Sequence, residues 1–161
     1  MMTLAAILAL PAQAQDRERD GGDRSPGHNR HIAGGSFGHT VLFGDWGTAF
    51  NDGFSFAGYY AYEATPIFGF LFNVSYSQHT GVAEDALTIW GIEPDIKINL
   101  AYFDSVAFYT MAGFGLYPVS QKIGPAQGSV LDFGMNIGFG IDLHLGEHFV
   151  FGPAIAFRSA F

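Results

Sequence analysis

The strongest constraint on the fold is a regular alternation of apolar residues with small or polar ones. Along residues 131–145 every odd position is apolar, and every even position is Gly, Asp, Asn or His. Successive side chains of a β-strand point to opposite faces, so this pattern predicts a two-faced strand. The same period predicts six further strands, at residues 37–44, 54–64, 68–79, 87–102, 105–119 and 149–161.

The composition excludes several classes of protein. The longest runs without a polar side chain are nine residues (4–12, 111–119 and 149–157), whereas a membrane-spanning helix needs about 20. Aromatic residues make up 16% of the chain, which is too apolar for a disordered protein. The net charge is −8, and after Ile32 the only bases are Lys97, Lys122 and Arg158. We therefore expect no nucleic-acid partner.

The two faces of the strands differ in a way that indicates which one is outside. One face carries large Phe, Ile, Leu, Tyr and Trp side chains, and the other carries Gly and Ala with isolated charges. Small residues and a few paired charges suit the interior of a narrow barrel. Outer-membrane barrels place the apolar face towards lipid. The pattern predicts an all-β, antiparallel up-and-down transmembrane β-barrel. The alternative is a soluble lipid-binding barrel with its apolar face inward.

The chain divides into three regions. Residues 1–14 resemble a secretory signal peptide, with an apolar core at 4–10 and a small-x-small site at 12–14, but without the usual basic segment. Residues 15–33 predict a disordered polar linker, in which His28 and His31 form no metal site. Residues 34–161 form the predicted barrel domain. We expect export to the outer membrane of a Gram-negative cell envelope.

Connections between the strands alternate in length. Residues 64–67, 103–104 and 146–148 predict tight turns, and residues 45–53, 79–86 and 120–129 predict longer loops. Outer-membrane barrels have short periplasmic turns and longer external loops, which orients the predicted barrel. Four aromatic residues near strand ends are expected in the interfacial girdles: Tyr62, Tyr76, Trp90 and Tyr102.

Three stretches resemble the small outer-membrane β-barrel proteins of the OmpA/OmpX-like superfamily. They are YEATPIFG at 62–69, MAGFGLY at 111–117, and NIGFGIDLHL at 136–145 followed by a tight turn and F-x-F-G-P at 149–153. The resemblance implies an eight-stranded barrel in outer-membrane lipid and lipopolysaccharide, inserted by the barrel-assembly machinery. It implies no catalytic, cofactor-binding or metal-binding residues and no cofactor.

About seven strands are visible, although single-chain bacterial barrels have an even number. We expect that the eighth strand, the last of the family's barrel, is missing from this chain. The alternative is a further strand within residues 33–50, with Phe161 as a C-terminal aromatic signal. Pro94 and Pro153 cannot donate a ladder hydrogen bond, so we expect bulges or gaps beside them.

Eight charged or titratable residues fall on the predicted inner face. They are Glu63, Glu93, Asp95, Lys97, Asp132, Asp142, His144 and Arg158. A plug of paired charges is favoured over an ion or proton path, because side chains fill the interior of an eight-stranded barrel. His144 and His148 beside Asp142 are too few ligands for a metal site.

Ser75, Ser77 and His79 share one face near the outer end of a strand and are candidates for a lipid-modifying site. A nucleophilic serine needs its base within about 3 Å, but alternate residues on a strand lie about 6.6 Å apart. We therefore expect a non-enzymatic protein with a structural or surface-interaction role in the envelope. A lipid A-modifying enzyme is the alternative.

Overall fold

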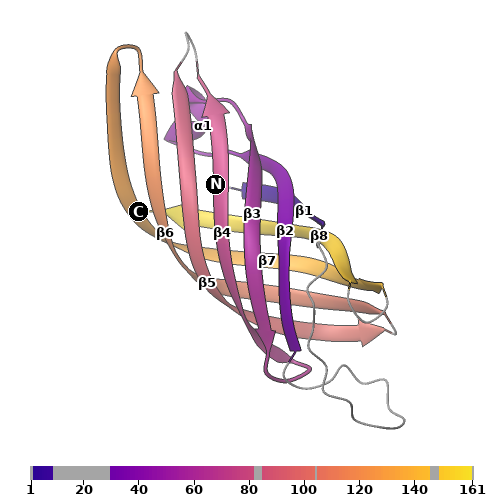
Figure 1. Ribbon diagram of the computed structural model, residues 1–161. Coiled ribbons are helices and arrows are strands. Elements are labelled where there is room, and N and C mark those ends of the chain that lie inside the picture. The colour runs from indigo at the N-terminus through magenta and orange to yellow at the C-terminus, as the bar shows by residue number, and fades with distance from the viewer. Residues whose placement is uncertain (1, 9–29, 82–84, 104, 146–148, 161) are drawn as a thin grey trace, which may run out of the picture.

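The protein folds into an antiparallel up-and-down barrel. The computed structural model describes residues 2–8, 30–81, 85–103, 105–145 and 149–160. Within them the strands follow chain order around a closed barrel (Figure 1). They are β1 (Met2–Leu8), β2 (Arg30–Val41), β3 (Gly53–Glu63), β4 (Phe68–Thr80), β5 (Ala86–Phe103), β6 (Val106–Ile123), β7 (Ala126–Leu145) and β8 (Phe149–Ala160). A short helix, α1 (Asp45–Ala49), lies between β2 and β3.

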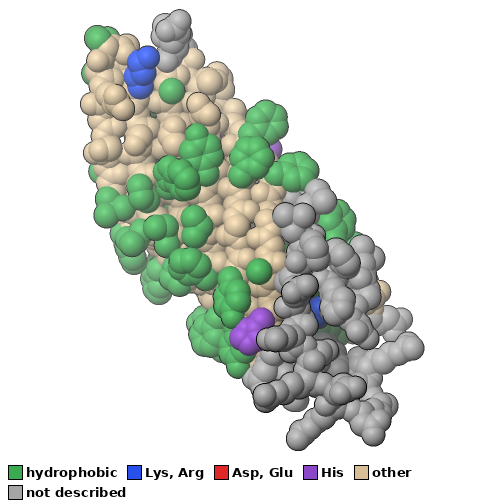
Figure 2. Space-filling view, viewed as in Figure 1, with side chains coloured by type: hydrophobic (Ala, Val, Ile, Leu, Met, Phe, Trp, Pro, Cys, Tyr) green, Lys and Arg blue, Asp and Glu red, His purple; other side chains and the backbone are tan. Residues whose placement is uncertain are grey.

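The predicted alternation is present in the described strands. The apolar side chains at every second position of a strand are exposed on the outside; Phe139, for example, has an exposed fraction of 58%. Their neighbours on the other parity are buried inside. Figure 2 shows hydrophobic side chains scattered over the described part of one outer face, where no Asp or Glu is visible. Among the described residues, no helix is long and apolar enough to cross a membrane.

The eighth strand is β1, which the sequence did not predict. Its backbone pairs with β2, where Ala5 faces Gly38, and with β8, where Ala5 faces Ala154. In the closed barrel described here β1 takes the eighth place, and the expectation that the family's last strand is missing from this chain stays a prediction. The alternative, a further strand within residues 33–50, is wrong, because these residues contain the end of β2 and helix α1. Phe161 lies outside the described residues.

The structure bears on the predicted boundaries at two points. Residues 2–8 of the predicted signal peptide form β1, and their removal by a signal peptidase stays a prediction. Strand β2 begins at Arg30, so residues 30–33 of the predicted linker belong to the barrel. The remainder of that linker, residues 15–29, lies outside the described residues.

One bulge changes the face of a predicted girdle residue. The β5–β6 register shifts between Asn99 and Ala101, leaving Leu100 as the extra residue. A bulge of one residue reverses the faces of the residues after it. Tyr102 therefore turns inward, with its hydroxyl 2.5 Å from Nδ2 of Asn99, and does not belong to the outer girdle. Pro94 and Pro153 produce gaps in the ladders without a register shift.

The two ends of the barrel are built differently. At one end, here called the turn end, β3 and β4 are joined by a tight turn at residues 64–67. At the other, the α1 end, lie α1 and the β6–β7 hairpin (Figure 1). The predicted long loop at 120–129 is wrong, because β6 and β7 continue to Ile123 and Ala126. Gly124 takes a φ of 55° in the two-residue turn, a conformation that favours glycine.

Candidate functional site

The lumen of the barrel contains most of the buried charged side chains of the described residues. Six of the eight residues predicted for it are buried: Glu63, Glu93, Asp95, Lys97, Asp142 and Arg158. Asp132 and His144 are half-buried on the same inner face. Because alternation alone placed these residues inside, this part of the prediction is confirmed.

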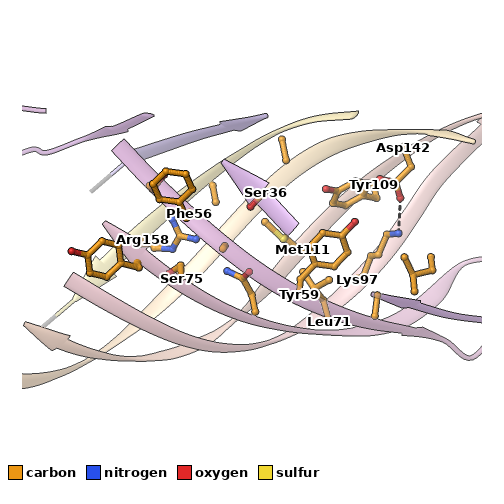
Figure 3. Close-up of a pocket in the computed structure, with 18 of the residues that line it drawn as sticks. Ser36, Phe56, Tyr59, Leu71, Ser75, Lys97, Tyr109, Met111, Asp142 and Arg158 are labelled. Atoms are coloured by element: carbon orange, nitrogen blue, oxygen red, sulfur yellow. Dashed lines mark hydrogen bonds and ion pairs between the residues drawn. The ribbon is translucent and has the colours of Figure 1, made fainter. Parts of the chain in front are cut away.

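Lys97 lies at the centre of a charge cluster near the turn end. Its Nζ atom is 2.9 Å from Oε1 of Glu63 and 2.7 Å from Oδ2 of Asp142. It also lies 4.7 Å from the centroid of the Tyr109 ring, a cation–π arrangement. Figure 3 shows Lys97 and Asp142 reaching towards each other from their strands. One ammonium group thus compensates two buried carboxylates.

A second charge cluster lies nearer the α1 end. Arg158 holds Glu93 with two hydrogen bonds, from Nε to Oε1 and from Nη2 to Oε2, the latter 2.9 Å long. Asn73 Nδ2 donates to the same Oε2 atom at 2.5 Å. A bidentate arginine–carboxylate pair is both strong and geometrically specific. Together with the Lys97 cluster it makes the paired-charge plug that the sequence predicted.

Large side chains also fill the lumen, which sequence reasoning missed because it expected mainly small residues there. Tyr59, Tyr109, Tyr117 and Met111 point inward (Figure 3 labels all but Tyr117). A Cβ atom on Gly34 would lie 2.5 Å from Tyr59, and one on Gly140 would lie 2.4 Å from Tyr109. The lumen glycines therefore make room for tyrosine rings. These tyrosines occupy odd positions in β3 and β6, where the outward apolar residues occupy even positions, and this alternation could have predicted that they point inward.

An apolar cluster lies at the α1 end of the barrel. It is made by buried side chains from β5, β6 and the segment between β2 and β3, with Trp46 of α1 packed against it. The buried members are Leu42, Phe50, Leu87, Ile89, Tyr117 and Val119. Wide outer-membrane barrels keep an aqueous channel, whereas here side chains occupy the mouth. Sequence reasoning had placed residues 45–53 in a plain loop.

Between the apolar cluster and the Lys97 cluster lies a small cavity of about 80 Å³. Its lining from β2, β3 and β4 is rich in hydroxyl groups, and its lining from β8 consists of Val150, Ala154, Ala156 and Arg158. The serine and threonine residues that line it are Ser36, Thr40, Ser55, Ser75 and Ser77. A buried water needs about 10–15 Å³ on this measure, so the cavity has room for several waters.

Ser77 and His79 are in contact, contrary to the expectation from strand spacing. His79 Nε2 lies 3.2 Å from Ser77 Oγ, and Nδ1 lies 3.1 Å from the carbonyl oxygen of Asn51. This geometry fits a neutral imidazole that donates from Nδ1 and accepts from the serine. However, the two residues are only 3% and 1% exposed, and both face the lumen. Among the described residues, both side chains are therefore shielded from the outer face of the barrel.

Of the remaining predicted residues, His144 and Tyr62 lie near the turn end, and Tyr76 and Trp90 lie farther along β4 and β5. His144 Nδ1 is 3.1 Å from Nη1 of Arg30, while His148 lies outside the described residues. No group of three or more His, Asp or Glu side chains among the described residues could hold a metal ion. On the outer face, the rings of Tyr76 and Trp90 pack edge to face with their centroids 5.0 Å apart. The ring centroids of Tyr62 and His31 are also 5.0 Å apart.

The fold and its inside-out polarity define a class: a small membrane-type β-barrel with a filled interior. The family model described as outer membrane protein beta-barrel domain matches residues 2–154, and the chain belongs to this family. No curated protein matches the chain significantly.

Proposed function

We propose that the protein is a non-enzymatic outer-membrane barrel that serves the cell envelope as a structural element or by presenting its α1 end to a partner. The observation that carries this proposal is the contrast between the two faces of the wall. Phe139 and its apolar neighbours are exposed outside, while Lys97 and Arg158 are paired with carboxylates inside. A soluble lipid-binding barrel needs the opposite arrangement.

The orientation follows from the connections. Longer connections face outward in barrels of this kind. The segment 42–52, which contains α1, is such a connection, although β6 and β7 meet at the same end in a two-residue turn. We therefore place the α1 end outward and the turn end at residues 64–67 in the periplasm. The β6–β7 hairpin is held to the neighbouring connection by a 2.8 Å hydrogen bond from the Gly124 amide to Asp85. The part of the barrel exposed at the cell surface would thus be the α1 end, whose connections are hydrogen-bonded to each other.

The filled lumen supports a structural rather than a transport role. The apolar cluster around Leu87 and Val119 closes one mouth, and the two charge clusters occupy the interior. Purified protein in planar lipid bilayers should show no sustained conductance. Discrete, long-lived current steps would contradict a closed lumen.

The direct test is expression in a Gram-negative host followed by membrane fractionation. The protein should be extracted with the outer membranes and should migrate differently on detergent gels before and after boiling, as folded barrels do. Recovery in the soluble periplasmic fraction would contradict the proposal.

A lipid-modifying enzyme is the second candidate, favoured by the 3.2 Å contact between Ser77 and His79. Its test is the lipid A mass spectrum of cells that express the protein, with Ser77→Ala as the matched control. A modification present with the native protein and absent with the variant would establish the enzyme. Identical spectra would remove this candidate.

A further inference from the structure

Asp95 stands apart from the other buried acids of the lumen. Glu63 and Asp142 share Lys97, and Glu93 is held by Arg158. In the part of the chain that the structure describes, Asp95 forms no ion pair, although only 5% of its surface is exposed. An isolated ionised carboxylate in such a position is costly, and a buried acid of this kind commonly takes up a proton instead.

The partner that Asp95 faces is Asn136. Asp95 on β5 and Asn136 on β7 are both register partners of Gly113 on β6, one from each side. The Oδ1 atom of Asp95 lies above Gly113, since a Cβ built there would come within 2.2 Å of it. The glycine therefore leaves space for the carboxyl group to lean across β6 towards Asn136, the partner of Gly113 on β7.

Two acceptor atoms in this pair have no hydrogen-bond partner. They are Oδ1 of Asp95 and Oδ1 of Asn136, both buried. An ionised carboxylate and an amide oxygen can only accept hydrogen bonds, so neither can satisfy the other. A protonated carboxyl group has one O–H donor, and that single proton would give both atoms a partner.

The charge of the lumen leads to the same assignment. Three carboxylates, Glu63, Glu93 and Asp142, would be balanced by the three bases Lys97, Arg158 and the half-buried Arg30. Ionised Asp95 would add a fourth negative charge beside Glu93. The half-buried Asp132 lies farther towards the α1 end, opposite Tyr117.

We propose that Asp95 and Asn136 form a proton-binding site inside the barrel, in which Asp95 is a neutral acid that donates a hydrogen bond to Asn136 Oδ1. The groups around it are Glu93 on the same strand, Arg158 on β8 and Tyr117 on β6. Arg158 binds Glu93 with two hydrogen bonds, and Asp95 forms no ion pair among the described residues, so we assign its compensation to the proton.

The first test observes the proton directly in the native protein. Infrared spectra of the folded barrel in detergent near neutral pH should contain the C=O stretching band of a protonated carboxyl group, shifted in D₂O. The band should be absent in Asp95→Asn and present in the matched control Asp142→Asn, which alters an ion-paired acid. No such band in the native protein, or one that persists in Asp95→Asn, would overturn the proposal.

The second test compares two neighbouring amide substitutions by urea unfolding in detergent micelles. Asp95→Asn keeps the shape and neutrality of a protonated acid and can still donate to Asn136, so its unfolding midpoint should equal or exceed that of the native protein. Glu93→Gln removes a paired charge and should lower the midpoint. A loss in Asp95→Asn as large as that in Glu93→Gln would show that Asp95 is ionised.

The same measurement across pH gives a third readout. If the folded state holds one more proton than the unfolded state, stability must fall as the pH rises. The native midpoint should therefore decrease as the pH rises above the ordinary aspartate range, and this decrease should be smaller in Asp95→Asn. Identical pH profiles for the two proteins would contradict the site.

Discussion

The ring of Tyr109 lies over Gly140, its register partner on the adjacent strand. A Cβ on Gly140 would come within 2.4 Å of the Tyr109 Cζ and Oη atoms. Tyr109 is buried and cannot swing into solvent. The same relationship joins Gly34 to Tyr59, so the glycine content of this barrel is a packing requirement of its lumen.

Gly140→Ala should therefore destabilise the barrel by about 1–3 kcal/mol, the usual cost of overpacking a filled interior. The measurement is urea unfolding in micelles, followed by tryptophan fluorescence. Gly58→Ala is the control, because no atom lies within 4 Å of a Cβ placed there. In a Tyr109→Ala background the cost of Gly140→Ala should shrink, since the clash is gone. Equal costs in both backgrounds would disprove the contact.

Lys97 compensates two buried carboxylates, Glu63 and Asp142, at 2.9 and 2.7 Å. Lys97→Ala leaves both of them without their cation, and removing one partner of a buried pair costs about 3–5 kcal/mol. We expect a folded barrel of much lower urea midpoint, or failure to refold in micelles. The control Lys122→Ala changes an exposed lysine and should have little effect. Equal midpoints for the two variants would show that the cluster contributes nothing to stability.

Strand β1 and the predicted signal peptide cannot both be present in the mature protein, because they share residues 2–8. Ala5 and Ala154 are Cα partners, and antiparallel partners lie at a distance that a disulfide can bridge. The chain has no cysteine, so the double variant Ala5→Cys/Ala154→Cys should form one internal disulfide, detected by its gel migration with and without reductant.

The matched control for this crosslink is Ala112→Cys/Ile137→Cys, which joins β6 to β7 and does not involve the N-terminus. Crosslinking of the control but not of the β1 pair would show that β1 does not close the barrel in the membrane. Mass spectrometry would then reveal a mature chain that begins at Gln15, as the signal-peptide prediction requires.

Period-2 alternation was sufficient to predict β2 to β8 and which face is outside, since both depend on residue parity, but it did not predict β1. It also placed Lys97, Glu63 and Arg158 in the lumen, although it could not say which charges pair. Pairing depends on strand register, and a shift at Leu100 was enough to turn Tyr102 inward. That shift involves no proline or glycine and leaves no mark in the sequence pattern.

The α1 end was harder to predict because its residues follow no period. Trp46 lies in the short helix α1 and Phe50 directly follows it; Phe50 belongs to the apolar cluster at the α1 end, and Trp46 packs against it. In the β6–β7 hairpin, residues 126–131 are exposed on both parities, so no apolar face marks the strand. The contact of Ser77 with His79 was missed for a different reason: ideal Cβ spacing ignores the length of the imidazole side chain.

The central claim is that the apolar outer face contacts lipid, and Trp90 tests it most directly. Trp90 is 48% exposed on that face, whereas Trp46 is packed into the mouth at the α1 end. In the single-tryptophan variant Trp46→Phe, reconstituted in bilayers, brominated acyl chains should quench the fluorescence of Trp90 strongly and aqueous iodide should quench it little. Strong quenching by iodide with none by the brominated lipid would contradict the membrane-spanning barrel.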